Sequence, residues 1–371
     1  MIDSEYDALI VGGGLIGLLA AHSLCDAGIT VAVVERGELG SEASWAGGGI
    51  LSPLYPWRYP APVLALARWS QAHYAALCDT LAEETGIDPQ WTRSGLLVLD
   101  PGDWQEGATW AVRQGSEFHM LTGRELLGCE PALSESLVID PGARAAWLPD
   151  VAQVRNPRLL KALKSSLRSR GVALYENTEV RDLRVVRGRV TGVTTATGKM
   201  SATRVIIAAG AWSGRLLENL GVSLSVSPVR GQMLLFHGRA GLLRRIVLHQ
   251  DRYIIPRRDG RILAGSTLEQ VGFDKATTAD ASLDLHRAAL NLMPALANCP
   301  VEQQWAGLRP GTPTGVPYIG AHPTMEGLYV CAGHYRNGVV LGLASARLLA
   351  DLVLDRSPII DPNPYAIPIK I

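Results

Sequence analysis

The sequence YDALIVGGGLIG, residues 6–17, decides the fold. Residues 9–11 are typical of a short buried strand, and the glycines that follow permit a tight turn and a close backbone approach to a diphosphate. Gly17 allows the next helix to pack on the strand. A diphosphate would lie at the N-terminus of that helix, where free N–H groups and the helix dipole favour negative charge. The stretch therefore predicts a dinucleotide site in which Gly12, Gly14 and Gly17 take part.

The context of this motif decides its meaning, because 39 glycines in 371 residues make chance matches common. The helix is predicted to end near Gly28, and residues 30–34 form a second apolar run rich in β-branched side chains. Glu35 closes that run, where a carboxylate can accept both hydroxyls of an adenosine ribose. The alternative is an ordinary glycine-rich turn, and it is disfavoured because strand, helix, strand and acid are all in register. We therefore expect a Rossmann-like α/β domain.

Composition restricts the partners and the compartment. Lysine plus arginine equals aspartate plus glutamate at 35 each, so net charge suggests neither nucleic acid nor an acidic membrane surface as a partner. The five cysteines are odd in number, widely spaced and without any Cys-x-x-Cys, which argues against a disulfide framework or a metal site and favours a reducing cytoplasm. The chain has no apolar run of membrane-spanning length, and residues 1–5 are acidic where a secretory signal would be basic. We expect a protein that is neither exported nor membrane-spanning.

Two further segments are candidates for cofactor contact. Residues 36–51 have too few large apolar groups to build core, but their glycines and serines can present backbone N–H and hydroxyl groups to a cofactor. The alternative for this segment is a mobile surface loop. Residues 208–213, AAGAWS, follow another buried strand and can approach the same dinucleotide from the other side.

The remaining pattern alternates between helices and strands. Helical periodicity covers residues 63–85, 104–114, 122–127, 155–170, 281–293 and 338–355, the last capped by Asn337. Strands are predicted over residues 94–99, 172–175, 185–190, 192–195, 204–209 and 327–333. Between residues 226 and 264 four successive strands predict an antiparallel meander, unlike the nucleotide half. The fold class is therefore a Rossmann-like domain with a second α+β domain built mostly on an antiparallel sheet.

Four motifs beyond the nucleotide start carry a resemblance to a known family. They are AAGAWS at 208–213, YIIPR at 253–257 with ILAGSTLE at 262–269, GLRPGTP at 307–313, and GHYRNG at 333–338. Over essentially its full length the chain resembles the glycine oxidases of the D-amino-acid-oxidase-like flavoenzymes, a family that also includes sarcosine oxidases. The resemblance implies a glutathione-reductase-like FAD domain assembled from residues 1–85, 150–220 and 305–371. Residues 86–149 and 221–304 would form a substrate domain that covers the flavin ring.

The resemblance also implies roles for individual residues. Tyr253 and Arg309 would grip the substrate carboxylate, and the backbone carbonyl of Arg336 would receive its amine. A planar guanidinium beside a phenol suits a carboxylate held at fixed geometry, whereas a lone arginine is more often a surface ion pair. Together the motifs and the resemblance give these cofactor residues: Gly12, Gly14, Leu15, Ile16, Gly17, Glu35, Arg36, Ser44, Ala46, Gly47, Gly48, Val180, Gly210, Trp212, Gly333, His334, Arg336, Asn337, Gly338 and Val339.

Departures from the family pattern leave the substrate range open. Ile50 stands where some relatives have methionine, and Asp251 and Arg252 replace polar residues beside the substrate tyrosine. Sarcosine oxidases that bind flavin covalently use a cysteine near the position of residues 308–310, which are Leu-Arg-Pro here, so we expect noncovalent FAD.

The expected activity is FAD-dependent oxidation of glycine and other small primary or secondary amino acids, with hydride transfer to flavin and oxygen as acceptor. The resemblance implies a role in supplying thiazole for thiamine. One alternative is a dehydrogenase that passes electrons to a quinone or carrier, and another is a flavin-binding module without turnover. A third, the flavin half of a tRNA-modifying enzyme, conflicts with the balanced charge. The expected partners are an amino acid and oxygen, with no nucleic acid and no membrane, and a homo-oligomer is left open.

Overall fold

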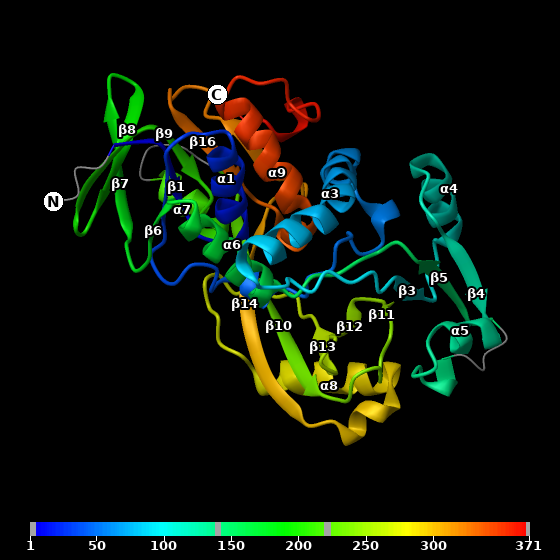
Figure 1. Cartoon of the computed structure of the whole chain (residues 1–371). Helices are drawn as coiled ribbons and strands as arrows, with labels where there is room; N and C mark the ends of the chain where they lie inside the picture. Colours follow the sequence, from blue (N-terminus) through cyan, green and yellow to red (C-terminus); the bar gives the residue numbers. More distant parts are fainter. Residues whose placement is uncertain (1–4, 138–141, 219–223, 369–371) are drawn as a thin grey trace.

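The computed structural model describes residues 5–137, 142–218 and 224–368 and contains two eight-stranded sheets (Figure 1). The first sheet has the order β15-β16-β9-β1-β2-β6, with β7 and β8 attached beside β9. Its strands are β1 (Glu5–Val11), β2 (Val31–Val34), β6 (Ala173–Tyr175), β7 (Val180–Val186), β8 (Arg189–Thr195), β9 (Gly198–Ile207), β15 (Tyr318–Ala321) and β16 (Leu328–Ala332). The strands β6, β2, β1, β9 and β16 are parallel, so their carboxyl ends meet at one edge, where open α/β sheets bind ligands.

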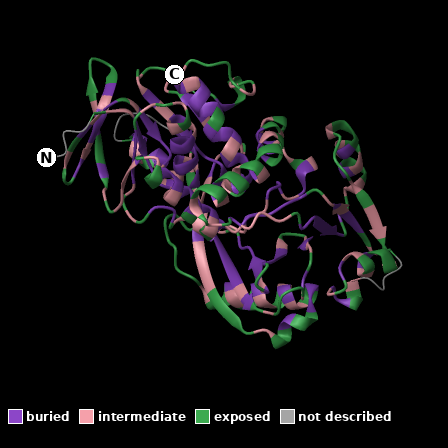
Figure 2. Cartoon of the chain, viewed as in Figure 1, coloured by how far each residue is buried: buried purple, intermediate pink, exposed green. Residues whose placement is uncertain are grey.

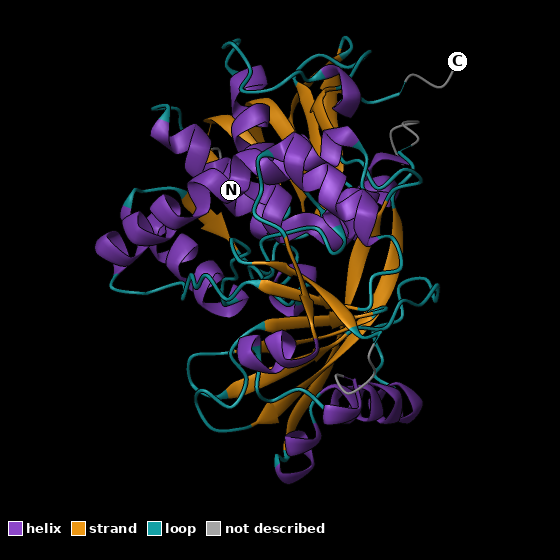
Figure 3. Ribbon diagram, turned by 90° about the vertical axis from the view of Figure 1, so that its right-hand side faces the viewer, coloured by secondary structure: helices purple, strands orange, loops and turns teal. Residues whose placement is uncertain are grey.

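Four helices cover one face of this sheet (Figures 1 and 3). They are α1 (Leu15–Asp26), α3 (Ala61–Thr85), α6 (Asn156–Ser169) and α9 (Gly338–Val353), and α9 contacts both α1 and α3. Helix α9 carries small and apolar residues almost all round, as expected for a helix enclosed by core. Figure 2 shows buried residues gathered in α9 and the strands beneath it, whereas much of α3 is exposed. The opposite face packs around Leu9, Val205 and Val330 and is covered in part by β7 and β8.

The second sheet has the order β14-β10-β13-β12-β11-β3-β5-β4 and is antiparallel except where β3 pairs with β11. Its strands are β3 (Leu96–Leu99), β4 (His119–Thr122), β5 (Arg144–Leu148), β10 (Ser227–His237), β11 (Ile246–His249), β12 (Arg252–Pro256), β13 (Arg261–Gly265) and β14 (Val301–Gly311). Helix α8 (Ala279–Leu292) packs on β10, β12 and β13 around Phe236, Ile254 and Leu285. This sheet has its own core, as a second domain requires.

The remaining elements are short or peripheral. The α-helices are α2 (Ala43–Ala46), α4 (Trp104–Gln114), α5 (Gly123–Cys129) and α7 (Ser213–Glu218). The 3₁₀ turns are η1 (Pro56–Arg58), η2 (Glu135–Leu137), η3 (Gly210–Trp212), η4 (Pro294–Asn298), η5 (Tyr335–Asn337) and η6 (Asn363–Tyr365). No helix in the part of the chain that the structure describes is both long and apolar enough to cross a membrane. All five cysteines are free thiols.

The α/β fold class is confirmed, and most of the predicted helices and strands are present with bounds that differ by a few residues. The strand predicted over residues 185–190 is wrong, because Arg187 and Gly188 form the turn between β7 and β8. Three further details differ. The four strands between residues 226 and 264 are not a simple meander, because β10 pairs with β13 rather than with β11. Strands β4, β5, β14 and β15 were not predicted. Asn337 is the N-cap of α9, but its side chain makes no capping hydrogen bond.

Strand β14 also bears on the domain boundary. The boundary expected between residues 304 and 305 falls inside β14, which pairs with β10 along most of its length. A boundary through a paired strand would break its hydrogen bonds, so we move it to follow Gly311. The division into an FAD domain and a substrate domain remains a proposal with that change.

Candidate active site

A cavity of about 590 Å³ lies at the carboxyl edge of the first sheet and extends to the second sheet. Its volume is in the range of cofactor and ligand sites. Of the residues expected to contact cofactor or substrate, all but two line it. They are Gly12, Gly14, Leu15, Ile16, Glu35, Arg36, Ser44, Gly47, Gly48, Val180, Gly210, Trp212, Tyr253, Arg309, Gly333, His334, Arg336, Asn337, Gly338 and Val339. The exceptions are Gly17 and Ala46, which do not line the cavity.

The glycines of the β1–α1 turn have three different tasks. Gly12 has a φ of 112°, and a Cβ there would lie 2.4 Å from the carbonyl oxygen of Ala208, so only glycine fits. A Cβ on Gly17 would lie 2.0 Å from the carbonyl oxygen of Gly12, which confirms that Gly17 lets the helix approach the strand. Gly14 has an ordinary φ of −73°, and a Cβ there would meet only the Ser44 hydroxyl, at 3.1 Å. Gly14 therefore keeps the cavity open rather than relieving strain.

Glu35 ties this turn to the end of β2. One carboxylate oxygen accepts a hydrogen bond from the Gly13 N–H at 2.8 Å, and the other accepts from the Gly37 N–H at 3.1 Å. A carboxylate has about four acceptor positions, so capacity remains for a ligand hydroxyl in the cavity that Glu35 lines.

Replacing Glu35 with alanine is expected to weaken FAD binding by about 1–3 kcal/mol, the range for losing hydrogen bonds to a charged acceptor. The variant also leaves the Gly13 N–H without its partner, so Glu35→Gln, which keeps one acceptor oxygen, should lose less. Flavin fluorescence titration of the apoprotein measures both affinities. An affinity equal to that of the wild type would remove Glu35 from the cofactor site.

The small-residue segment is hydrogen-bonded to α1 and α6, which disfavours the alternative of a mobile surface loop. The Ser44 hydroxyl accepts from the Leu15 N–H at 2.8 Å, and the Asn156 amide donates to the Ser44 carbonyl at 2.8 Å. A Cβ on Gly48 would lie 2.7 Å from Cδ1 of Ile255, so the segment packs directly on β12. Ala46 faces β14 instead of the cavity, and its carbonyl accepts from the Trp305 indole N–H at 3.0 Å.

Two side chains from separate strand–helix units meet at the cavity wall. The Arg36 guanidinium carbon lies 3.8 Å from the ring centroid of Trp212, within cation–π range. Arg36 follows β2, whereas Trp212 belongs to the AAGAWS turn after β9. The AAGAWS turn thus approaches the same cavity from the other side, as the sequence predicted.

The N-terminus of α9 brings unsatisfied polar groups to the cavity. His334 is buried, and its Nε2 has no hydrogen-bond partner within the described chain. Burial lowers the pKa of His334 to about 3, so the ring is neutral. Helix α9 has no acidic residue in its first turn and no side-chain cap. Buried polar atoms normally find partners, so this region fits a cofactor with acceptor atoms at its edge.

The substrate candidates come from the second sheet and from η5. Arg309 on β14 donates from Nη2 to the Ser266 hydroxyl at 2.7 Å and from Nη1 to the Thr267 carbonyl at 3.1 Å. Burial lowers the pKa of Arg309, the hydroxyl of Tyr253 opposes this, and the charge of Arg336 adds to it. The structure therefore brings Tyr253, Arg309 and Arg336 to one cavity, with the Arg336 side chain exposed at its edge.

Two glycines inside strands make room for these side chains. A Cβ on Gly231 of β10 would lie 2.1 Å from Nη1 and 2.2 Å from Nη2 of Arg309. A Cβ on Gly265 of β13 would lie 2.8 Å from Cε2 of Tyr253 and 2.3 Å from Sδ of Met233. The sequence analysis missed both, although an isolated glycine within a strand is a known sign of close approach.

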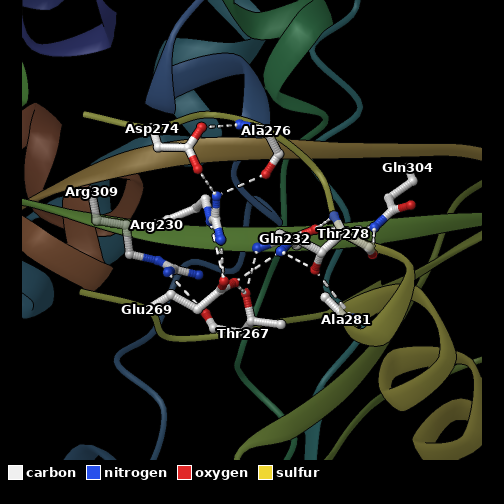
Figure 4. Close-up of polar contacts among 10 residues, drawn as sticks. All are labelled: Arg230, Gln232, Thr267, Glu269, Asp274, Ala276, Thr278, Ala281, Gln304 and Arg309. Atoms are coloured by element: carbon white, nitrogen blue, oxygen red, sulfur yellow. Dashed lines mark hydrogen bonds and ion pairs between the residues drawn. The ribbon is translucent and has the colours of Figure 1, made fainter. Parts of the chain in front are cut away.

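An ionic network centred on the buried side chain of Arg230 supports the segment that holds Arg309 (Figure 4). Arg230 is 4% exposed and donates from Nε to Glu269 at 3.1 Å and from Nη1 to Asp274 at 2.6 Å. The Thr267 hydroxyl donates to Glu269, and the Gln232 N–H donates to the Thr267 hydroxyl at 2.9 Å. The network fixes residues 266–269 and so positions Arg309. Its members lie far apart in sequence, and the sequence analysis did not find them.

The three residues that depart from the family pattern differ in their position relative to the first cavity. Ile50 lines the cavity, whereas Asp251 and Arg252 do not. Arg252 instead donates to the Ser266 carbonyl at 3.1 Å and pairs with Asp284 at 2.7 Å. Ile50 is therefore the one of these three that can contact a bound molecule directly.

Comparison with known proteins gives consistent matches over the whole chain. A family profile described as FAD dependent oxidoreductase (DAO) matches residues 7–352. Glycine oxidase of Pseudomonas aeruginosa is 50% identical over 359 residues, covering 96% of this chain and 97% of the relative. The bifunctional protein ThiO/ThiG of Synechocystis is 33% identical, and the match covers 97% of this chain but 53% of that protein. The crystal structure of glycine oxidase from Geobacillus kaustophilus superposes with a TM-score of 0.93 at 35% identity, covering 99% of each chain.

Proposed function

The chain belongs to the family of FAD-dependent oxidoreductases, and from this premise we propose that it oxidises glycine and other small primary or secondary amino acids. Oxidation gives an imine, which hydrolyses to an oxo acid and either ammonia or an amine. Oxygen is the electron acceptor and is reduced to hydrogen peroxide. The single observation that supports this most strongly is the 50% identity to a glycine oxidase over nearly the full chain. The cavity, with a guanidinium and a phenol at one side, is chemically compatible with it.

FAD, when bound, supplies a two-electron acceptor that takes hydride from the substrate and passes electrons to oxygen. We place its diphosphate at the β1–α1 turn, where Gly14 leaves space and the α1 N-terminus favours negative charge. Glu35 would accept a ribose hydroxyl, and His334 with the α9 N-terminus would face the flavin. No cysteine replaces Leu308 or Pro310 beside Arg309, which supports noncovalent binding.

We assign the substrate carboxylate to Arg309 and Tyr253. Each Nη of a guanidinium carries two N–H donors, so Arg309 keeps donors for a ligand after its bonds to Ser266 and Thr267. Those two bonds fix the plane of the guanidinium, which supports a bidentate pair with a planar carboxylate. The Arg336 backbone carbonyl would receive the amine. Such a site works mainly by orientation, because no strong acid or base is needed at the α-carbon for hydride removal.

Replacing Gly338 with aspartate is expected to lower the flavin midpoint potential by roughly 30 mV, the two-electron equivalent of about 1.4 kcal/mol. The bare N-terminus of α9 acts as a fixed partial positive charge, and reduced flavin carries negative charge at its pyrimidine edge. A Cβ at Gly338 would have only the His334 Cβ near it, at 3.6 Å, so the fold tolerates a side chain. Gly338→Asn, without the charge, is the matched control. Equal potentials for the aspartate and asparagine variants, with FAD bound in both, would place the flavin elsewhere.

We also propose a cellular context. The five free cysteines are compatible with a reducing cytoplasm. The relative named ThiO/ThiG and the family resemblance support a role in making the thiazole of thiamine. A homo-oligomer is compatible with the chain.

Peroxide and oxygen measurements test the proposed function. With glycine as substrate, the purified holoenzyme should consume oxygen and release hydrogen peroxide in equal amounts. Stopped-flow mixing of the reduced enzyme with oxygen should give reoxidation at least as fast as turnover. Reoxidation much slower with oxygen than with a quinone would favour a dehydrogenase instead.

A further inference from the structure

A second cavity, of about 170 Å³, is lined by residues from two of the connections between the sheets, from the β10–β11 connection and from the end of β12. One connection leads from α3 to β3 and the other from β5 to α6. They run side by side, since Thr92 and Gln153 exchange two backbone hydrogen bonds of 2.9 Å. The lining includes four arginines and no carboxylate; they are Arg155, Arg244, Arg257 and Arg258.

Two of these four arginines are neutralised by the protein and two are not. Arg155 pairs with Asp259 at 2.7 Å, and Arg258 pairs with Asp88 at 2.7 Å. Arg257 donates only to neutral acceptors: the Gln153 amide oxygen at 2.6 Å, the Val154 carbonyl at 3.1 Å and the Gly48 carbonyl at 2.9 Å. The exposed side chain of Arg244 forms neither an ion pair nor a hydrogen bond in residues 5–137, 142–218 and 224–368. Two positive charges at this cavity therefore lack a direct ion-pair partner among the described residues.

Arg257 is the unusual member, because it is only 9% exposed. Burial lowers the pKa of Arg257 to about 9, the charge of Arg155 adds to this and the nearby charge of Asp259 opposes it, so the side chain is still protonated at neutral pH. A buried charge is normally paired, because its desolvation is unfavourable without an opposite charge. An anion in the cavity would supply that opposite charge.

We propose that this cavity binds a small tetrahedral dianion of the phosphate class, between Arg244 at the mouth and Arg257 at the floor. Two unpaired guanidinium groups match a dianion in charge, and guanidinium groups bind phosphate oxygens with two N–H donors at once. The Ser94 hydroxyl accepts from the Gln153 amide at 2.6 Å, so its own proton is available to a third oxygen. The dianion is either free phosphate or the phosphate group of a small ester.

The proposed site is separate from the first cavity but touches its wall. Arg257 donates to the carbonyl of Gly48, and Gly48 lines the first cavity. The same guanidinium therefore contacts both the proposed anion site and the small-residue segment. Anion binding in the second cavity does not depend on which substrate the first cavity takes.

Isothermal titration of the holoenzyme tests the proposal, with chloride keeping the ionic strength constant. Inorganic phosphate should bind saturably at one site per chain. Arg244→Gln should raise its Kd at least about tenfold, because it removes a charged donor. The control is Arg239→Gln. Arg239 is exposed and lies, like Arg244, in the connection from β10 to β11, but it does not line the cavity. The Kd of this variant for phosphate should equal that of the wild type.

A parallel titration with glycerol 2-phosphate separates the two sources of the dianion. Tighter binding than inorganic phosphate assigns the site to a phosphate ester, and weaker binding assigns it to free phosphate. Phosphate heat no greater than that of chloride, or equal Kd values for Arg244→Gln and Arg239→Gln, would overturn the proposal.

Discussion

Replacing Gly14 with valine is expected to give a folded protein that is colourless, with an FAD affinity at least about 100-fold below that of the wild type. The backbone of Gly14 has φ −73° and ψ −177°, which any residue can adopt. A Cβ there would approach only the Ser44 hydroxyl, so the branched methyl groups would project into the cavity where we place the diphosphate. Absorbance at the flavin band and circular dichroism measure occupancy and folding together.

Two other glycines make this result interpretable. Gly102→Val is the matched control, because no atom lies within 4 Å of a Cβ at that position, and it should keep full flavin. Gly12→Val should disturb the fold itself, because its Cβ would overlap the backbone of Ala208. Full flavin occupancy in Gly14→Val would show that the first turn is not the diphosphate site.

Replacing Arg309 with alanine is expected to raise the KM for glycine at least about 100-fold while FAD stays bound. A charge-assisted bidentate pair in a partly dry site is typically worth more than about 2–3 kcal/mol. Arg309→Lys should restore only part of the loss, because an ammonium lacks the planar fork. Steady-state oxygen uptake gives the KM, and the flavin absorbance confirms cofactor loading.

Gly231→Ala tests the same site without changing a charged residue. Its Cβ would lie 2.1 Å from Nη1 of Arg309, so the guanidinium must move away from its two hydrogen-bond acceptors. The KM for glycine should rise here as well. A normal KM in Arg309→Ala together with a raised KM in Arg336→Ala would transfer the carboxylate role to Arg336.

The nucleotide half was predictable because its signals are local. Gly12, Gly17 and Glu35 belong to one strand–helix–strand unit, and their spacing reports directly on the turn. The N-cap position of Asn337 was also readable, since a buried strand precedes it and an apolar helix follows. The lack of a capping hydrogen bond from the Asn337 side chain was not predictable, because capping geometry depends on the orientation that packing imposes at the cavity.

The substrate half was less predictable because its geometry arises from strand pairing. Strand β14 contains Gly307, Pro310 and Gly311, which normally mark turns, yet it forms the edge of the sheet, where proline is tolerated. Gly231 of β10 pairs with Gly307 of β14, and the guanidinium of Arg309, two residues further along β14, lies where a Cβ on Gly231 would be. No local pattern links Gly231 to Arg309. The resemblance supplied Arg309 and Tyr253 as candidates, but not the network of Arg230 and Glu269 behind them.

Anaerobic titration of the flavin absorbance tests the central claim most directly. Glycine, sarcosine, both alanines and both prolines are added in turn to the oxygen-free holoenzyme. We expect glycine to bleach the oxidised flavin band and admission of oxygen to restore it. Failure of every one of these amino acids to bleach a fully loaded flavin would contradict the account and indicate a flavin-binding protein without amino-acid turnover.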